Sequence, residues 1–274
     1  MRALARRHPL VTFVVLAYGL SWAYWIPLAL RGVHVTPGGS DTHFPGLLGP
    51  ALAAFITSAL VDGDAGVRTL WHRLWHVSKP TSAFWLLALS PLAFLAIALL
   101  VAHLAHRVPP LGDLYVFSGL PRLPLTAVLL LVLIFNGYGE ETGWRGFALP
   151  RLQERFGPIW GPVLLGVIWA GWHVPSFPVI EGYSTMTLPV LIFGFGLGIV
   201  CGSIVLADVF DRTGGSVLAA AVWHLVYNMS AATLGSRGVV GAVSTTCVEV
   251  WAVIIVLQRW RAQRNFRAVV HEAR

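Results

Sequence analysis

The chain has 274 residues, of which 56% are hydrophobic and only 11% are charged, and its mean hydropathy is +0.72. Soluble globular domains carry about 25% charged residues, so the composition excludes an ordinary soluble domain. The formal net charge of +7 raises the question of a nucleic-acid partner. Because the basic residues are divided among short segments between apolar runs, we expect no nucleic-acid binding.

Apolar runs long enough to cross a bilayer recur from one end of the chain to the other. A membrane span needs about 17–25 such residues, and helices are expected because lipid offers no hydrogen-bond partner to an open backbone. The sequence therefore predicts an all-α fold, a polytopic transmembrane bundle of about eight helices in a single membrane domain, residues 1–274. The predicted spans are 10–30, 45–61, 83–105, 123–149, 159–174, 188–207, 217–234 and 239–257.

The first span follows the basic opening MRALARRH, as the core of a signal peptide would. Its apolar run is longer than the about 7–15 residues of a signal core, and no small-residue cleavage site follows cleanly. We therefore interpret it as a retained helix. Trp22, Tyr24 and Trp25 near its far end are expected at the membrane interface.

Between the second and third spans, the stretch VRTLWHRLWHV combines basic and aromatic positions in a pattern typical of an interfacial helix. It contains His72 and His76, whose spacing of four could bind a metal. Because no acidic residue lies nearby in sequence, solvent or lipid headgroups are the favoured surroundings. Cys201 and Cys247 both fall inside predicted spans and are expected to be small core residues.

The distribution of the 19 Lys and Arg residues indicates an orientation. With eight spans and the N-terminus inside, fifteen of them fall in inner segments and four in outer segments. Basic residues favour the cytoplasmic side. The sequence thus predicts a multi-pass protein of the cell (inner or plasma) membrane with both termini cytoplasmic, the bilayer as a partner, and a basic tail after residue 257 beside anionic lipid.

Few polar residues occur within the apolar spans, and such residues indicate function because they are unfavourable in lipid. The segment GYGEETGWRGF holds two adjacent acids and an arginine. Residues four apart share a helix face, so Glu141 should pair with Arg145, while Glu140 is rotated by about 100° and left without that partner.

Two later spans carry further polar residues: His173 lies in VIWAGWHVPSF, and His224 and Asn228 lie four apart in AVWHLVYNMS. Singly, each has a structural explanation, as a helix-end ion pair or a hydrogen bond between helices. Together, in a chain with few other intramembrane ionisable groups, they favour one shared polar site.

The motifs EETGWR, WAGWH and HLVYN resemble those of the CPBP intramembrane proteases, the CAAX prenyl protease and bacteriocin-processing group also called the Abi family. That pattern is Glu-Glu-x-x-x-Arg, then Phe-x-x-x-His, then His-x-x-x-Asn/Asp on successive helices, and Trp169 here stands where Phe is usual. The resemblance covers a core of about residues 123–234. The matching site residues are Glu140, Glu141, Arg145, His173, His224 and Asn228.

The resemblance implies an intramembrane endopeptidase that hydrolyses peptide bonds of a membrane-associated protein or peptide. If the roles of the family's motif residues apply at the matching positions, Glu140 and His173 activate the attacking water, and His224 and Asn228 stabilise the oxyanion. Glu141 and Arg145 hold the site.

The need for a metal stays open at this point. Glu140, His173 and His224 are the set that would hold zinc, if any is bound, because one Glu and two His form a familiar zinc site. A metal-independent glutamate mechanism needs no cofactor, and the motif His-Glu-x-x-His is absent from the sequence.

One point of geometry also stays open. Glu140 lies about 13 Å before the predicted inner end of its span, whereas His173 lies about 22 Å along the next one, at 1.5 Å per residue. For the two to meet, the second helix must tilt or begin outside the membrane. The Pro and Gly residues of FGPIWGP allow such a break.

Two other classes of protein fit the same features. A non-catalytic membrane immunity or scaffold protein would share the fold without the chemistry, but it would not need to keep every pocket residue. A proton-coupled transporter would also carry Glu and His in mid-membrane, but its inverted halves find no match in the sequence.

Overall fold

The computed structural model describes residues 2–272, and within that range the protein is helical, with isolated bridges between loops but no β-sheet. The all-α prediction is therefore confirmed. The α-helices are α1 (Arg2–Arg7), α2 (Pro9–Leu30), α3 (Phe44–Leu47), α4 (Gly49–Val61), α5 (Gly63–Trp75), α6 (Thr81–Ala88), α7 (Pro91–Leu104), α8 (Leu125–Val132), α9 (Gly139–Gly143), α10 (Leu149–Trp172), α11 (Glu181–Ser184), α12 (Leu197–Arg212), α13 (Val217–Ala231) and α14 (Val239–Glu272).

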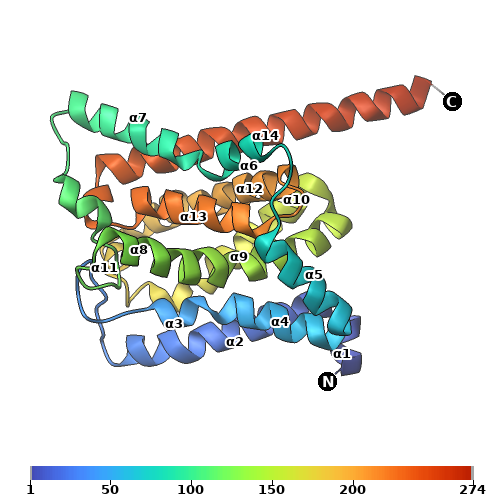
Figure 1. Ribbon diagram of the computed structural model, residues 1–274, viewed down its shortest axis with the longest axis horizontal. Helices are drawn as coiled ribbons and strands as arrows, with labels where there is room; N and C mark the ends of the chain where they lie inside the picture. Colours follow the sequence, from blue (N-terminus) through green and yellow to red (C-terminus); the bar gives the residue numbers. More distant parts are fainter. Residues whose placement is uncertain (1, 273–274) are drawn as a thin grey trace.

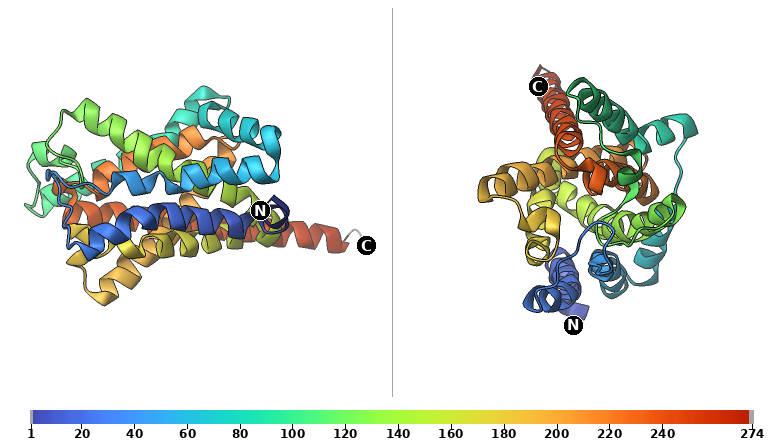
Figure 2. Two further views of the ribbon diagram at one scale, coloured as in Figure 1. Left: turned by 90° about the horizontal axis from the view of Figure 1, so that it is seen from below. Right: turned by 90° about the vertical axis from the view of Figure 1, so that its left-hand side faces the viewer.

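The long helices run roughly along one axis of the molecule (Figure 1). The N-terminal helix α1 lies toward the same end as the far end of α14, and α11 lies at the opposite end (Figures 1 and 2). Helix α13 packs against α6, α7, α9, α12 and α14, so it lies inside the bundle. Its three consecutive buried alanines, residues 219–221, let these neighbours approach closely.

By length and composition, five helical stretches of the described chain could cross a membrane, or six if α6 and α7, which are bent by 42°, form one span. A multi-pass membrane bundle is thus supported, and length and composition alone separate five or six of the about eight predicted spans. The stretch Leu125–Ser176 is continuous across the fourth and fifth predicted spans, and α13, with 15 residues, is shorter than a full span. The five are Pro9–Leu30, Phe44–Val61, Leu125–Ser176, Val190–Arg212 and Val239–Asn265.

A sharp turn inside α10 removes the geometric difficulty between Glu140 and His173. Gly157 has φ 79° and ψ 175°, a backbone conformation that is unfavourable for residues with a side chain. Beyond it the chain folds back, so that a Cβ on Gly161 would lie 2.8 Å from the backbone nitrogen of Gln153. The first arm therefore extends several residues past the predicted end at 149, and the break predicted in FGPIWGP occurs.

Two glycines allow the segment with both glutamates to pack directly on neighbouring backbone. A Cβ on Gly139 would lie 2.8 Å from the carbonyl oxygen of Leu47, and one on Gly143 would lie 2.6 Å from both Cβ and the carbonyl oxygen of Pro50. Small residues spaced by four are a common means of close helix packing in membranes. They hold α9 against α3 and α4.

Replacing Gly143 with Ala should therefore destabilise the protein by about 1–3 kcal/mol, the usual effect of overpacking a core. Thermal or denaturant unfolding in detergent measures it. The matched control is Gly19→Ala in α2, where no atom of the described residues lies within 4 Å of the added Cβ and helix propensity favours Ala by about 1 kcal/mol. Equal stability of the two variants would contradict this packing.

The aromatic residues near the end of α2 lie differently from the interface expected for them. Trp25 is fully buried, and its ring centroid is 4.6 Å from that of Trp172 on α10. The indole N–H of Trp22 donates to the carbonyl oxygen of Trp172 at 2.9 Å. The interfacial prediction was wrong for Trp25, because its ring fills the core beside the end of α10.

Candidate active site

The two adjacent glutamates lie in a helix that is unusually wound on both sides. Between α8 and α10, π-helical turns at Leu133–Tyr138 and Trp144–Ala148 flank α9. Such turns are rare and frequently occur at functional sites. Glu140 is 2% exposed, and Glu141 and Arg145 are fully buried, so three charged side chains are enclosed within one short segment.

Glu141 is the centre of a buried ionic network. Its Oε1 accepts a hydrogen bond from Nη1 of Arg145 at 3.0 Å, in the i,i+4 pair expected from the sequence. The same oxygen lies 2.7 Å from Nδ1 of His224, which arrives from α13. One carboxylate thus binds two nitrogen donors from two helices, and it orients the imidazole of His224.

Glu140 points to a different helix, as the helical phase predicted. Its Oε2 accepts a hydrogen bond from the indole N–H of Trp169 at 2.8 Å. Directly after the last residue of α10, Nδ1 of His173 lies 2.8 Å from the carbonyl oxygen of Trp169. A carbonyl only accepts, so Nδ1 carries the proton and Nε2 of His173 keeps its lone pair.

Trp169 joins these two halves of the site. The guanidinium carbon of Arg145 lies 4.5 Å from the centroid of its ring, a cation–π distance. Its ring also meets that of His224 edge to face, with centroids 5.6 Å apart. The tryptophan in the usual Phe position thus contributes an N–H donor that Phe lacks, and the motif comparison alone did not predict this hydrogen bond.

Asn228 follows His224 by one turn on α13 and is half-buried. Among the described residues, no hydrogen bond joins its side chain to Glu140, Glu141 or His173. The structure therefore brings Glu140, Glu141, Arg145, His173 and His224 together through direct contacts or through Trp169, and it leaves Asn228 at the margin on the His224 side.

Helix α2 fixes the end of α10 that carries His173. Tyr18 donates to the carbonyl oxygen of Ile168, and Trp22 donates to that of Trp172. The ring of Trp172 in turn meets His173 edge to face, with centroids 4.8 Å apart. The N-terminal part of the chain, which carries no motif, therefore supports the site from outside the 123–234 core.

A further histidine lies close to this end of α10. His43, just before α3, is 5% exposed, and its Nδ1 has no hydrogen-bond partner among the described residues. Burial lowers the pKa of His43 to about 3, so its ring is neutral. Nothing in the sequence distinguished His43 from the other histidines in loops.

The zinc set left open by the sequence does not form here. Within residues 2–272, no three His, Cys, Asp or Glu side chains are grouped so that they could hold a metal ion. Nδ1 of His224 is directed at Glu141, and Glu140 accepts from an indole. Glu140, His173 and His224 as arranged do not fit a zinc site.

The fold and the site define the class of protein. A helical, multi-pass membrane bundle encloses two adjacent glutamates, an arginine and two histidines on three neighbouring helical segments. Residues 122–230 match the family model described as "Type II CAAX prenyl endopeptidase Rce1-like". The matched residues include all three motifs, so this similarity agrees with the resemblance that the motifs indicated, and the matched family is one of proteases.

A curated relative supports the same resemblance. The chain is 25% identical over 197 residues to "CAAX prenyl protease 2" of Methanococcus maripaludis, an alignment that covers 68% of this chain and 69% of that protein. The likeness therefore extends well beyond the three motifs and includes a large part of the bundle.

Proposed function

We propose that this protein is an intramembrane endopeptidase that hydrolyses a peptide bond of a membrane-associated protein or peptide. Similarity to this protease family supports protease activity. The observation that carries the proposal is the division between the two glutamates: Glu141 binds Arg145 and His224, whereas Glu140 faces the Trp169–His173 turn of α10. One acid is thus used to hold the site, and the other remains for chemistry.

In the proposed reaction, Glu140 takes a proton from a water molecule, whose oxygen attacks the peptide carbonyl carbon. Nε2 of His173, which has a free lone pair, accepts a hydrogen bond from the same water and orients it. The tetrahedral oxyanion then collapses, and the proton held by Glu140 passes to the leaving nitrogen. Collapse gives one new carboxylic acid and one new amine. The carboxylic acid then releases the second proton of the water and becomes a carboxylate, and the step requires no cofactor.

His224 acts as a hydrogen-bond donor in the proposed reaction, whereas His173 acts as an acceptor. The carboxylate of Glu141 accepts from Nδ1 of His224 and favours the doubly protonated ring, whose Nε2–H then donates to the oxyanion. The carboxamide of Asn228, one turn away, is the proposed second donor. Removing one such donor typically lowers kcat by about 10²–10³.

Trp169 provides a graded test of this arrangement. We expect Trp169→Phe to keep the fold and the ring over Arg145 but to lose about 10- to 150-fold in kcat/KM, because a hydrogen bond to a charged group contributes about 1.5–3 kcal/mol. Trp169→Ala should lose much more, since it also removes the ring that joins Arg145 and His224. Steady-state rates of both variants, with melting temperatures measured alongside, check this. A Phe variant as impaired as the Ala variant would contradict the role given to the ring.

The substrate class follows from the family only as far as a peptide held at the membrane. A C-terminal Cys-a-a-X peptide with a prenylated cysteine and the same peptide without the lipid are the direct probes. Purified protein in lipid nanodiscs should cleave at least one of them, and the ratio of the two rates measures how much the lipid contributes. Failure of a well-folded protein to cleave either peptide would count against the proposal.

We also propose that both termini face the cytoplasm. The proposal rests on the fifteen-to-four division of basic residues and on the common end of the bundle toward which α1 and the end of α14 lie (Figure 1). Terminal epitope tags should be digested by protease in inverted membrane vesicles and protected in intact cells. Opposite exposure of the two tags would exclude this orientation.

A further inference from the structure

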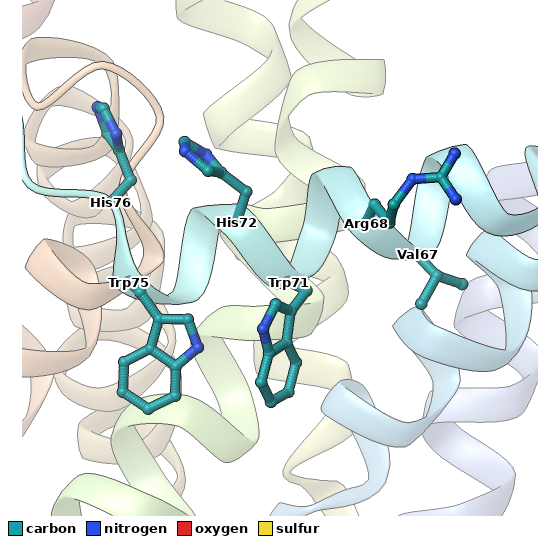
Figure 3. A pocket seen from close by; sticks show the side chains of 6 residues that line it. All are labelled: Val67, Arg68, Trp71, His72, Trp75 and His76. Carbon is teal, nitrogen blue, oxygen red and sulfur yellow. The ribbon is translucent and has the colours of Figure 1, made fainter.

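Helix α5 has one face in the bundle and one outside it. Leu70 and Leu74 are buried, whereas Trp71 and Trp75 are 56% and 58% exposed. Two exposed tryptophans one turn apart are typical of an amphipathic helix that lies in the membrane interface. Figure 3 shows both indoles directed to the same side of α5.

A basic row runs along α5 beside the tryptophans. Arg68 and His72 lie four residues apart on α5 and so share a helix face, and His76 directly follows the last residue of the helix. The imidazole centroids of His72 and His76 are 5.3 Å apart, and both rings point away from the two indoles (Figure 3). Two imidazoles are fewer than the three or four protein ligands of a zinc site, so the row is better suited to an anion than to a metal.

Two hollows adjoin along this basic row. One, of about 470 Å³, is lined by Val67, Arg68, Trp71, His72, Trp75 and His76. The other, of about 360 Å³, shares the three residues of the row and adds Thr69, Arg73, Gly214 and Gly215. Among the described residues, no acidic side chain lines either hollow. An apolar, aromatic hollow therefore adjoins a basic one, with the row between them.

This helix is also tied directly to the segment with the two glutamates. Nη1 of Arg73 donates to the carbonyl oxygen of Gly146 at 2.6 Å, and the hydroxyl of Tyr138 donates to the carbonyl oxygen of Leu74 at 3.1 Å. Tyr138 precedes the two glutamates in sequence and Gly146 follows them, so these bonds connect α5 to the segment on both sides of Glu140 and Glu141. A ligand that orders α5 would therefore also order residues 138–146.

We propose that α5 binds the headgroup of one anionic phospholipid. The phosphate lies beside Arg68 and His72, and the acyl chains follow Trp71 and Trp75 into the bilayer. Charge complementarity selects an anionic lipid, because both hollows are lined by basic and neutral residues alone. The bound lipid holds α5 in position, and through Arg73 it steadies the segment that carries the candidate site.

Native mass spectrometry of the purified protein tests the binding, with phosphatidylglycerol and phosphatidylcholine as probes. We expect one phosphatidylglycerol to be retained at least fivefold more strongly than phosphatidylcholine. The double variant Arg68→Gln/His72→Gln, at exposed positions, should lose this preference. The control Arg155→Gln, an exposed arginine near the Gly157 turn of α10, should keep it, and Arg68→Glu repeats the test by charge reversal.

Equal retention of the two lipids, or equal loss in the double variant and the Arg155→Gln control, would overturn the site. Displacement of the lipid by millimolar inorganic phosphate would indicate a simple anion site and would likewise overturn it. Hydrogen exchange tests the connection without any activity: phosphatidylglycerol should slow exchange of residues 138–146 in the wild type and not in the double variant. Unchanged exchange in the wild type with lipid bound would exclude the connection through Arg73.

Discussion

Glu140→Gln should abolish peptide cleavage while the protein still folds and inserts. The amide keeps the shape of the side chain and can still accept the indole N–H of Trp169, but it cannot take a proton from water. General-base catalysis contributes about 10²–10⁴ to rate, so a loss of at least that size is expected. The measurement is single-turnover cleavage of a reporter peptide by purified variants in nanodiscs.

The melting temperature of the same samples serves as the control for folding. Glu141 is paired with Arg145, whereas no described residue forms an ion pair with Glu140. Its replacement should therefore leave the melting temperature close to that of the wild type. Full activity in a well-folded Glu140→Gln protein would end the proposed mechanism.

Glu141→Gln should act mainly on stability. Glu141 and Arg145 are both fully buried, and the same carboxylate oxygen contacts His224. Removing the negative charge leaves a buried guanidinium without compensation, and breaking such a pair typically costs about 3–5 kcal/mol. Partial activity should remain at low temperature, because Glu140 and His173 are untouched, but the rate should fall because His224 loses the carboxylate that favours its doubly protonated ring. Unfolding in graded denaturant, alongside rate, measures both effects.

A surface ion pair gives the matched control for this variant. Asp62 and Arg151 are 2.6 Å apart but 40% and 26% exposed, so Asp62→Asn should cost at most about 1 kcal/mol. If Glu140→Gln and Glu141→Gln instead lose the same activity and the same stability, both acids serve only to hold the helix. That outcome would favour the scaffold alternative over the protease.

Helical spacing was sufficient to predict the division between the two glutamates. The four-residue interval from Glu141 to Arg145 fixes their pairing on any α-helix, and the 100° rotation of Glu140 directs it elsewhere. The polar residues in apolar spans likewise predicted which helices would meet, because burial of such groups without partners is unfavourable. These conclusions depend on local geometry, which sequence specifies directly.

Tertiary contacts account for what the sequence did not predict. That Nδ1 of His224 would contact Glu141 rather than Glu140 depends on how α13 is rotated against α9, which no local rule fixes. The donor from Trp169 and the support of α10 by Tyr18 and Trp22 depend on packing between distant segments. The π-helical turns and the position of the turn at Gly157 also moved the helix ends away from the predicted bounds.

The most direct test of the central claim follows the oxygen atom of water. Purified wild-type protein in nanodiscs is incubated with the prenylated and unprenylated Cys-a-a-X peptides in ¹⁸O-labelled water, and the products are identified by mass spectrometry. The proposed mechanism predicts one new carboxylate that carries ¹⁸O in the wild type, and uncleaved peptide with Glu140→Gln. Equal cleavage by the well-folded Glu140→Gln variant, or no labelled product from well-folded wild type, would contradict it.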